Sequence, residues 1–396
     1  MRASAALTEG IKLLAPELEC LTVDFPREVS PAMEALLRRA YLESLKLMPD
    51  VYGRIYRMSE LRAAEPGATR VASNVYERIS QVSELWASRY AGVYREGDHP
   101  DTHRRYPRGS GLRTLGRLAK ETEAKALVAP HFYGAGVLGN YKEENPRVFA
   151  AVVLTDYVPH PVGVPPNLDL YVVADEAAAE AVEKLGVPEK RIHPTGIPID
   201  PVFEEPADVP GVRRDLLGLP EDRGEDDLPV VIVMGGGLGG GDLESSVALL
   251  LEASAAMHLV ILCGSNTSSC ERLRYLAEKR RRSAIFLPFT NRVRDLMAAS
   301  TVLVTKPGGM SCTEALSLSL PQVLFNPIPG QEEDNAAAIV RYGAGVMVES
   351  TDDILGETLK ILTSPNHQRR MVEAARAAHR PHSARSAASL ILEGLS

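Results

Sequence analysis

The chain is poor in the residue types that mark several large classes of protein. Among its 396 residues there are four cysteines and one tryptophan, and only 5% of the residues are aromatic. The cysteines lack the spacing of metal ligands and are too sparse for a scaffold built on disulfides, which favours a reducing compartment. Acidic residues (52) outnumber basic ones (44), and the net charge of −8 argues against a nucleic-acid partner, whose binding surface should be basic.

Long apolar runs are also missing. No stretch approaches the roughly 20 apolar residues with which a helix crosses a bilayer. Residues 1–7 resemble the start of a signal peptide, but Glu9 and Lys12 interrupt any apolar core and no cleavage site follows. We therefore expect a cytoplasmic protein that lies peripherally on the inner face of the cell membrane without crossing it.

Short apolar runs alternate with helical patterns along most of the chain. This alternation is typical of βα units and predicts an α/β fold with parallel sheets. The predicted strands cover residues 20–24, 126–129, 148–154, 170–174, 230–234, 259–263, 284–287, 302–305 and 322–326. Before the first of them the chain opens on a helical pattern, with Ala5, Leu7, Ile11 and Leu14 on its apolar side.

The length and one irregular segment predict two domains. At roughly 150 residues per domain, 396 residues suggest two or three. Residues 201–229 break the alternation, because they are rich in Pro, Asp and Glu and have no periodicity. We predict one α/β domain over residues 1–200, an inter-domain connection at 201–229 and a second α/β domain with C-terminal helices over 230–396.

Three loops of the second domain have the composition of a phosphate and sugar site. The strand at 230–234 leads into GGGLGGGD at 235–242, the strand at 302–305 into KPGG at 306–309, and the strand at 322–326 into a polar run that ends at Asn335. Glycines and helix N-termini suit a diphosphate, and the third loop offers polar groups for sugar hydroxyls. The alternative is that these glycines are only turn residues.

The first of these loops also contains the pattern G-x-G-x-x-G, which occurs in dinucleotide sites. Its usual partner is absent. The next predicted strand, 259–263, ends in GSN at 264–266 rather than in the acid that binds a ribose. This absence disfavours NAD or FAD.

The order of these motifs resembles one enzyme family over nearly the whole chain. MGGGLG at 234–239, CGSN at 263–266, TKPGG at 305–309 and PGQEEDN at 329–335 are similar to the monogalactosyldiacylglycerol synthases and the related processive diacylglycerol glucosyltransferases of glycosyltransferase family 28. The first domain resembles the same family in TDYxxH at 155–160, LYVVA at 170–174 and HPTGIPI at 193–199.

The resemblance implies a GT-B architecture, two Rossmann-like domains with parallel sheets facing a central cleft. The second domain would hold UDP-galactose or UDP-glucose and the first would hold diacylglycerol. Phe289 would lie by the uracil, Glu314 would take the ribose hydroxyls, and Lys306 would meet the diphosphate. The full set of donor residues implied is Gly236, Gly237, Gly264, Asn266, Phe289, Lys306, Gly308, Gly309, Glu314, Gly330, Gln331, Glu332 and Asn335.

The chemistry predicts an inverting transfer that needs no cofactor and no metal. Preorganised N–H groups, a helix dipole and Lys306 can stabilise the departing UDP, and the sequence has no Asp-x-Asp to hold a cation. The acceptor hydroxyl must lose a proton to a side chain of the first domain. The candidate bases are His131, Asp156 and His160, each of which follows an apolar strand; hydrogen-bonded loop histidines are the alternative.

In the family, a strand and a glycine-rich loop ending in histidine precede the segment that matches residues 2–6. The resemblance therefore implies that the first strand is missing here, because the true start lies upstream or because this is a truncated homologue. Residues 31–62 combine basic, aromatic and apolar side chains, which predicts either a pair of surface helices or an interfacial segment on anionic lipid, and the basic residues of 104–125 extend such a face.

Three other functions use the same plan of two domains. They are transfer of N-acetylglucosamine to a peptidoglycan-type lipid, 2-epimerisation of a UDP-sugar, and nucleotide-sugar binding without catalysis. An epimerase needs more acids in its cleft and no lipid surface, so the segment 31–62 counts against it.

Overall fold

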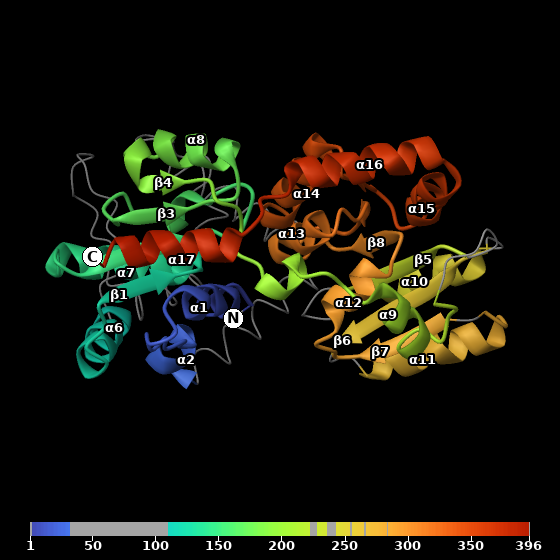
Figure 1. The fold of residues 1–396 in the computed structure, drawn as a ribbon, viewed down its shortest axis with the longest axis horizontal. Coiled ribbons are helices and arrows are strands. Elements are labelled where there is room, and N and C mark those ends of the chain that lie inside the picture. Colours follow the sequence, from blue (N-terminus) through green and yellow to red (C-terminus); the bar gives the residue numbers. More distant parts are fainter. Residues whose placement is uncertain are drawn as a thin grey trace, which may run out of the picture. The chain divides into compact units, whose positions relative to one another are not determined.

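The structure is a computed structural model and describes residues 2–31, 110–221, 228–235, 243–253, 256–264, 267–282 and 284–395. The chain forms two compact units (Figure 1). Unit 1 contains Met1–Asp200 and Ser383–Ser396, and unit 2 contains Pro201–His382. Both units carry a parallel sheet, so the α/β prediction is confirmed. No helix in the described ranges is both long and apolar enough to cross a membrane.

The sheet of unit 1 has the strand order β1-β2-β3-β4. Its strands are β1 (Ala126–Ala129), β2 (Phe149–Val153), β3 (Leu170–Val172) and β4 (Ile192–His193). The first three fall within the predicted runs, and their apolar side chains are mostly buried, as a sheet covered on both faces requires. The two residues of β4 are too few to show a strand pattern, and the sequence did not predict them.

The helices of unit 1 pack on this sheet and on one another. The helices of unit 1 are α1 (Arg2–Leu14), α2 (Phe25–Val29), α6 (Ser110–Glu121), α7 (Phe132–Glu144), α8 (Glu176–Lys184) and α17 (Ser383–Glu393), with the 3-10 turns η1 (Pro161–Gly163) and η2 (Glu189–Arg191). Helix α1 confirms the predicted opening helix, but Ala5 and Leu14 are exposed and only Leu7 of the four predicted apolar residues is fully buried. The strand predicted at 20–24 is wrong, because those residues have neither helix nor strand structure.

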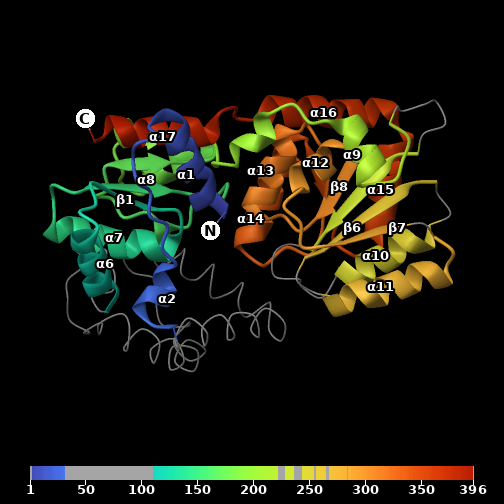
Figure 2. The ribbon, with the colours of Figure 1, turned by 60° about the horizontal axis from the view of Figure 1, so that its bottom comes forward.

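The division into units differs from the predicted domain boundaries at two places. Helix α17 was expected in the second domain, but it lies beside α1 (Figures 1 and 2) and buries Ala387, Ala388 and Ile391 in the core of unit 1. Residues 201–221 were expected as a connection, but η3 (Pro201–Glu204) and α9 (Val209–Asp215) belong to unit 2. Their apolar side chains Phe203 and Val212 are buried, which fixes this segment to the unit.

The sheet of unit 2 has six strands in the order β10-β9-β8-β5-β6-β7, all parallel. They are β5 (Val230–Met234), β6 (His258–Gly264), β7 (Ala284–Pro288), β8 (Val302–Thr305), β9 (Gln322–Leu324) and β10 (Gly345–Met347). Five of them were predicted from their apolar runs. The three residues of β10 were not, since their pattern is too short to separate from a loop.

The helices of unit 2 pack on this sheet and on one another. They are α10 (Leu243–Glu252), α11 (Thr267–Lys279), α12 (Val293–Ala298), α13 (Gly309–Ser317), α14 (Gln331–Tyr342), α15 (Asp353–Thr363) and α16 (Pro365–Ala378). Helix α10 packs on β5, α11 on β6 and β7, and α15 on β8 and β9. A disulfide joins Cys263 to Cys270. The low cysteine content argued against a disulfide scaffold, and no motif predicted this bond.

Candidate functional site

The carboxyl ends of the parallel strands of unit 2 meet at one edge of its sheet. In open α/β sheets, ligands bind outside this edge. Strand β8 pairs with β5 on one side and with β9 on the other, so the ends of these three strands are neighbours. The sequence placed the diphosphate and sugar contacts in the loops that follow these strands, of which residues 236–242 after β5 lie outside the described residues.

The loop after β8 leads directly into a helix N-terminus. Thr305 ends the strand, Gly308 is the residue before α13, and the Gly308 N–H donates to the carbonyl of Lys306 over 2.9 Å. The first N–H groups of a helix have no partner inside it and carry the positive end of the dipole. The half-buried Lys306 adds a positive charge beside them. This arrangement suits an anion.

The loop after β9 is held by its own acidic residues. Gly330 has a φ of +88°, which favours glycine, and it precedes α14. The Glu332 carboxylate accepts the N–H of Ile328 over 2.7 Å, and the Glu333 carboxylate accepts the N–H of Gly330 over 2.9 Å. Glu332, expected at the sugar, therefore also fixes the loop.

The loops after β8 and β9 approach each other closely. A Cβ built on Gly308 would lie 4.0 Å from Oε1 of Glu332. Burial and the nearby carboxylates of Glu332 and Glu314 raise the pKa of the Cys312 thiol, so both acids lie near one buried sulfur. The two helices that follow these loops also contact each other.

Two of the predicted ligand contacts are buried. Glu314 on α13 is 2% exposed and Asn335 on α14 is fully buried. Gln331 is half-buried at the start of α14, and Gly309 is buried at the start of α13. In the described structure, Glu314 and Asn335 thus face protein atoms rather than solvent.

The ends of β6 and β7 carry the remaining donor candidates. Gly264 has a φ of +59°, a conformation that strains any residue with a side chain. Phe289 directly follows β7 and is 81% exposed, the most exposed of the large apolar side chains in the described ranges. A flat aromatic ring left in solvent is available to stack on a planar base. Gly236, Gly237 and Asn266 lie outside the described residues.

The candidate bases of unit 1 lie at the corresponding edge of its sheet. His131 follows β1, Asp156 and His160 follow β2, and these two parallel strands are paired, with Ala129 opposite Val152. Solvent reaches His131, whereas Asp156 and His160 are half-buried. Desolvation nevertheless lowers the pKa of His131, which favours the neutral base.

Sequence reasoning missed one polar cluster of unit 2. Glu244, in the first turn of α10, accepts hydrogen bonds from Ser269 and Arg272 of α11. The three residues share no motif, and they are 28 positions apart at most. They meet because α10 and α11 pack side by side, a contact that no local pattern reveals.

Two family profiles match most of the chain. Residues 61–199 match the family described as Monogalactosyldiacylglycerol (MGDG) synthase, and residues 230–391 match the Glycosyltransferase family 28 C-terminal domain. A processive diacylglycerol beta-glucosyltransferase of Bacillus pumilus (strain SAFR-032) is 29% identical over 261 residues, which are 65% of this chain. The matched region spans 66% of the length of that relative.

Solved structures share the fold at low identity. MurG of Acinetobacter baumannii gives a TM-score of 0.54 at 15% identity, over 72% of this chain and 77% of that one. UDP-GlcNAc 2-epimerase of Neisseria meningitidis, bound to UDP-GlcNAc, gives 0.53 at 12% identity, over 82% of this chain and 89% of that one. The fold is the predicted GT-B fold. The chain belongs to the family of the monogalactosyldiacylglycerol synthases and processive diacylglycerol β-glucosyltransferases, with the C-terminal domain of glycosyltransferase family 28.

Proposed function

We propose that the protein is an inverting hexosyltransferase that moves galactose or glucose from a UDP-sugar to diacylglycerol and makes a β-glycosyldiacylglycerol. The observation that carries the proposal is that β5, β8 and β9 end side by side at one sheet edge, where Lys306 and the N-terminus of α13 follow β8. The relative from Bacillus pumilus, named as a diacylglycerol beta-glucosyltransferase, supports the acceptor. Unit 2 takes the donor and unit 1 the acceptor.

On the donor side, the bond between the anomeric carbon and the β-phosphate oxygen breaks. The leaving UDP gains negative charge, and the N–H groups at the start of α13 are oriented before the reaction to stabilise it. Lys306 contributes its charge at the same place. We propose that these groups take the role that a divalent cation has in other transferases, so that the reaction proceeds in EDTA.

On the acceptor side, the lipid hydroxyl oxygen bonds to the anomeric carbon from the face opposite UDP. Its proton passes to a base, for which unit 1 offers His131, Asp156 and His160 at one sheet edge. His131 is the first choice, because its lowered pKa keeps the imidazole neutral near pH 7. Attack opposite the leaving group inverts the α-linked donor into a β-glycoside.

A direct assay tests this proposal. The protein is incubated with diacylglycerol and either UDP-galactose or UDP-glucose, with and without EDTA, and glycolipid and free UDP are quantified. We expect one of the two donors to give equal amounts of glycolipid and UDP. UDP release without glycolipid contradicts the acceptor, and activity only with UDP-N-acetylglucosamine and a lipid-linked muropeptide favours the peptidoglycan-type reaction instead.

We also propose that the protein works on the inner face of the cell membrane through an anionic lipid surface. The segment 31–62 that motivates this lies mostly outside the described residues. In the described part of the adjoining basic stretch, Arg117 of α6 is paired with Glu121 over 2.8 Å and Glu28 over 3.6 Å, which leaves Arg113 and Lys120 as its other basic side chains. Vesicle sedimentation tests the proposal: binding should rise with anionic lipid and fall with salt, and equal binding to neutral vesicles contradicts it.

A further inference from the structure

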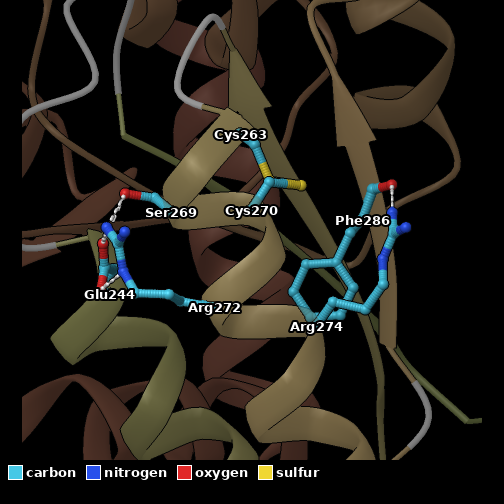
Figure 3. Close-up of a disulfide and its surroundings, with 7 residues drawn as sticks. All are labelled: Glu244, Cys263, Ser269, Cys270, Arg272, Arg274 and Phe286. Atoms are coloured by element: carbon cyan, nitrogen blue, oxygen red, sulfur yellow. Dashed lines mark hydrogen bonds and ion pairs between the residues drawn. A yellow bond between two sulfur atoms is a disulfide. The ribbon is translucent and has the colours of Figure 1, made fainter.

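The Cys263–Cys270 disulfide spans the loop after β6 (Figure 3). Cys263 lies near the end of the strand, Cys270 lies in the first turn of α11, and their Cα atoms are 5.5 Å apart. Both are in the core of unit 2, with 3% and 9% of their surface exposed. The bond therefore fixes the position of α11 relative to the strand end at which Gly264 bends the chain.

The same turn of α11 is tied to the helix that follows the glycine-rich loop. Ser269 donates to Glu244 over 2.5 Å, and Arg272 donates to Glu244 through Nε over 3.1 Å (Figure 3). These bonds lower the pKa of the Glu244 carboxyl, so it is charged at neutral pH. Glu244 is in the first turn of α10, two residues after the loop GGGLGGGD ends. Because of these hydrogen bonds, a shift of α11 would also displace the start of α10.

One turn further on, α11 also contacts the strand that ends beside Phe289. The Arg274 guanidinium lies 5.9 Å from the ring centroid of Phe286 and donates to the Phe286 carbonyl over 3.4 Å (Figure 3). Phe286 is in β7, and Phe289 follows that strand. Helix α11 is therefore linked to β6 by the disulfide, to β7 by Arg274 and to the start of α10 by Glu244.

We propose that Cys263 and Cys270 form a reversible dithiol–disulfide pair that controls the affinity of this edge for the UDP-sugar. The inference rests on the proposed function for the identity of the ligand. In the oxidising direction, a small-molecule or protein disulfide takes up two electrons and the two thiol protons and leaves as two thiols, while the Sγ–Sγ bond forms. A dithiol reverses the step and becomes oxidised itself.

The direction of the effect follows from the order that the bond imposes. In the oxidised protein, the disulfide closes the six residues between the cysteines into a ring. This restricts the conformations of the segment, so less conformational entropy is lost when a ligand binds. When the bond is reduced, the first turn of α11 loses its covalent link to β6 and keeps its hydrogen bonds to Glu244 and its packing in the core. We expect the oxidised protein to bind UDP more tightly, by roughly three- to tenfold, the range that ordering one or two side chains produces.

The first experiment establishes the redox pair without using UDP. The full chain is treated with oxidised glutathione or with dithiothreitol, then unfolded and alkylated. Its mass is measured by mass spectrometry to count the alkylated cysteines. We expect two alkylated cysteines after oxidation and four after reduction, with Cys20 and Cys312 modified in both states. Four modified cysteines after oxidation overturn the proposal.

The second experiment measures UDP binding to both forms by calorimetry. The expected result is a three- to tenfold weaker Kd after reduction. Cys270→Ala should bind like the reduced protein in both buffers, and Cys20→Ser, in unit 1, should keep the full redox response. Equal Kd values for oxidised and reduced wild-type protein overturn the switch while leaving the UDP site intact, and no binding in either state overturns the proposed function as well.

Hydrogen exchange supplies a readout that needs neither ligand nor variant. Reduction should raise exchange in the first turns of α11 and α10 and leave α16 of the same unit unchanged. An exchange pattern that is identical in the two redox states contradicts the coupling between these elements.

Discussion

Gly10 of α1 lies against the backbone of Ala384 in α17, so closely that a Cβ on Gly10 would stand 2.5 Å from the Ala384 carbonyl oxygen. A real Cβ does not approach an oxygen to this distance, so the two helices meet only because position 10 lacks a side chain. The contact brings the first and last described helices of unit 1 together.

Gly10→Ala should destabilise unit 1 by about 1–3 kcal/mol, since the methyl group forces the helices apart. Gly356→Ala is the matched control, because Gly356 is also helical but has no atom within 4 Å of its Cβ position. At position 356 the gain in helix propensity should raise the free energy of unfolding by about 0.5–1 kcal/mol. Hydrogen exchange of α1 and α17 measures the effect, and unchanged protection in Gly10→Ala would show that the helices do not pack this closely.

Apolar patterns predicted most of the sheets but not the partners of the helices. β5 and β8 match their predicted runs residue for residue, because a central parallel strand is buried on both faces and shows as a continuous apolar run. The run at 20–24 looks similar but is coil, since Leu21 is 63% exposed and no strand pairs with it among the described residues. Helix α17 was misassigned because its partner α1 lies more than 350 residues away in the sequence.

Phe289→Ala should weaken UDP binding about tenfold, while Phe289→Tyr should retain it. Stacking of a base on an aromatic ring is worth about 1–3 kcal/mol. Because the ring is 81% exposed, the free energy of unfolding should stay unchanged in both variants. Tyr275→Ala, another exposed aromatic residue of unit 2, is the control and should bind UDP normally. Calorimetry with UDP decides the matter, and wild-type affinity in Phe289→Ala removes this residue from the site.

Glu314→Gln should weaken UDP binding by about 1.5–3 kcal/mol, the loss of one charge-assisted hydrogen bond to the ribose. Glutamine keeps the shape of this buried side chain, so thermal unfolding should separate a binding defect from a packing defect. Glu373→Gln, on the exposed side of α16, is the control. An unchanged Kd in Glu314→Gln would mean that the buried carboxylate is structural.

The candidate site was predictable where it depends on strand order and not where it depends on tertiary contacts. Glycine-rich loops after apolar strands placed Lys306 and Gly308 at the sheet edge, because parallel strands end on the same side. The position of α14 on its neighbours determines two other features of the site. They are the hydrogen bond from the Ile328 N–H to the Glu332 carboxylate and the burial of Asn335. The disulfide is a further case, since seven positions of separation become a short distance only through the turn from strand to helix.

Lys306→Ala should lower kcat by about 10²–10³ and change the Kd for UDP much less. The charge of Lys306 is proposed to act on the leaving diphosphate, and removing one such group from a preorganised site typically costs this factor. Lys306→Arg should restore part of the rate, whereas Lys360→Ala, at an exposed ion pair of α15, should have none of these effects. Steady-state kinetics and UDP calorimetry are the measurements. A weaker Kd for UDP with an unchanged kcat would assign the lysine to ground-state binding.

The acid limb of the pH–rate profile should report His131. Its pKa is lowered below the usual value of 6.5 by desolvation, so kcat/KM should stay constant from neutral pH down to about 6.5 and fall only below it. His131→Gln should lose about 10²–10⁴ in rate and remove this limb. If His160→Gln or Asp156→Asn produces that loss instead, the base is the residue after β2.

A stability measurement tests the same pKa shift without catalysis. A histidine whose pKa is lowered by folding binds its proton more tightly in the unfolded chain, so acid favours unfolding. Above about pH 6.5 both states are neutral at His131 and the shift has no effect. Between that pH and the lower pKa of the folded state, the unfolded chain takes up the proton first. The free energy of unfolding therefore decreases as the pH is lowered through this range. The difference in unfolding midpoint between pH 7.5 and pH 5.5 should therefore be smaller in His131→Gln than in the wild type, whereas His367→Gln on α16 serves as the control histidine. If His131→Gln and the wild type show the same decrease in unfolding midpoint on acidification, His131 is not desolvated in the folded protein. Its choice as the base then loses its physical support.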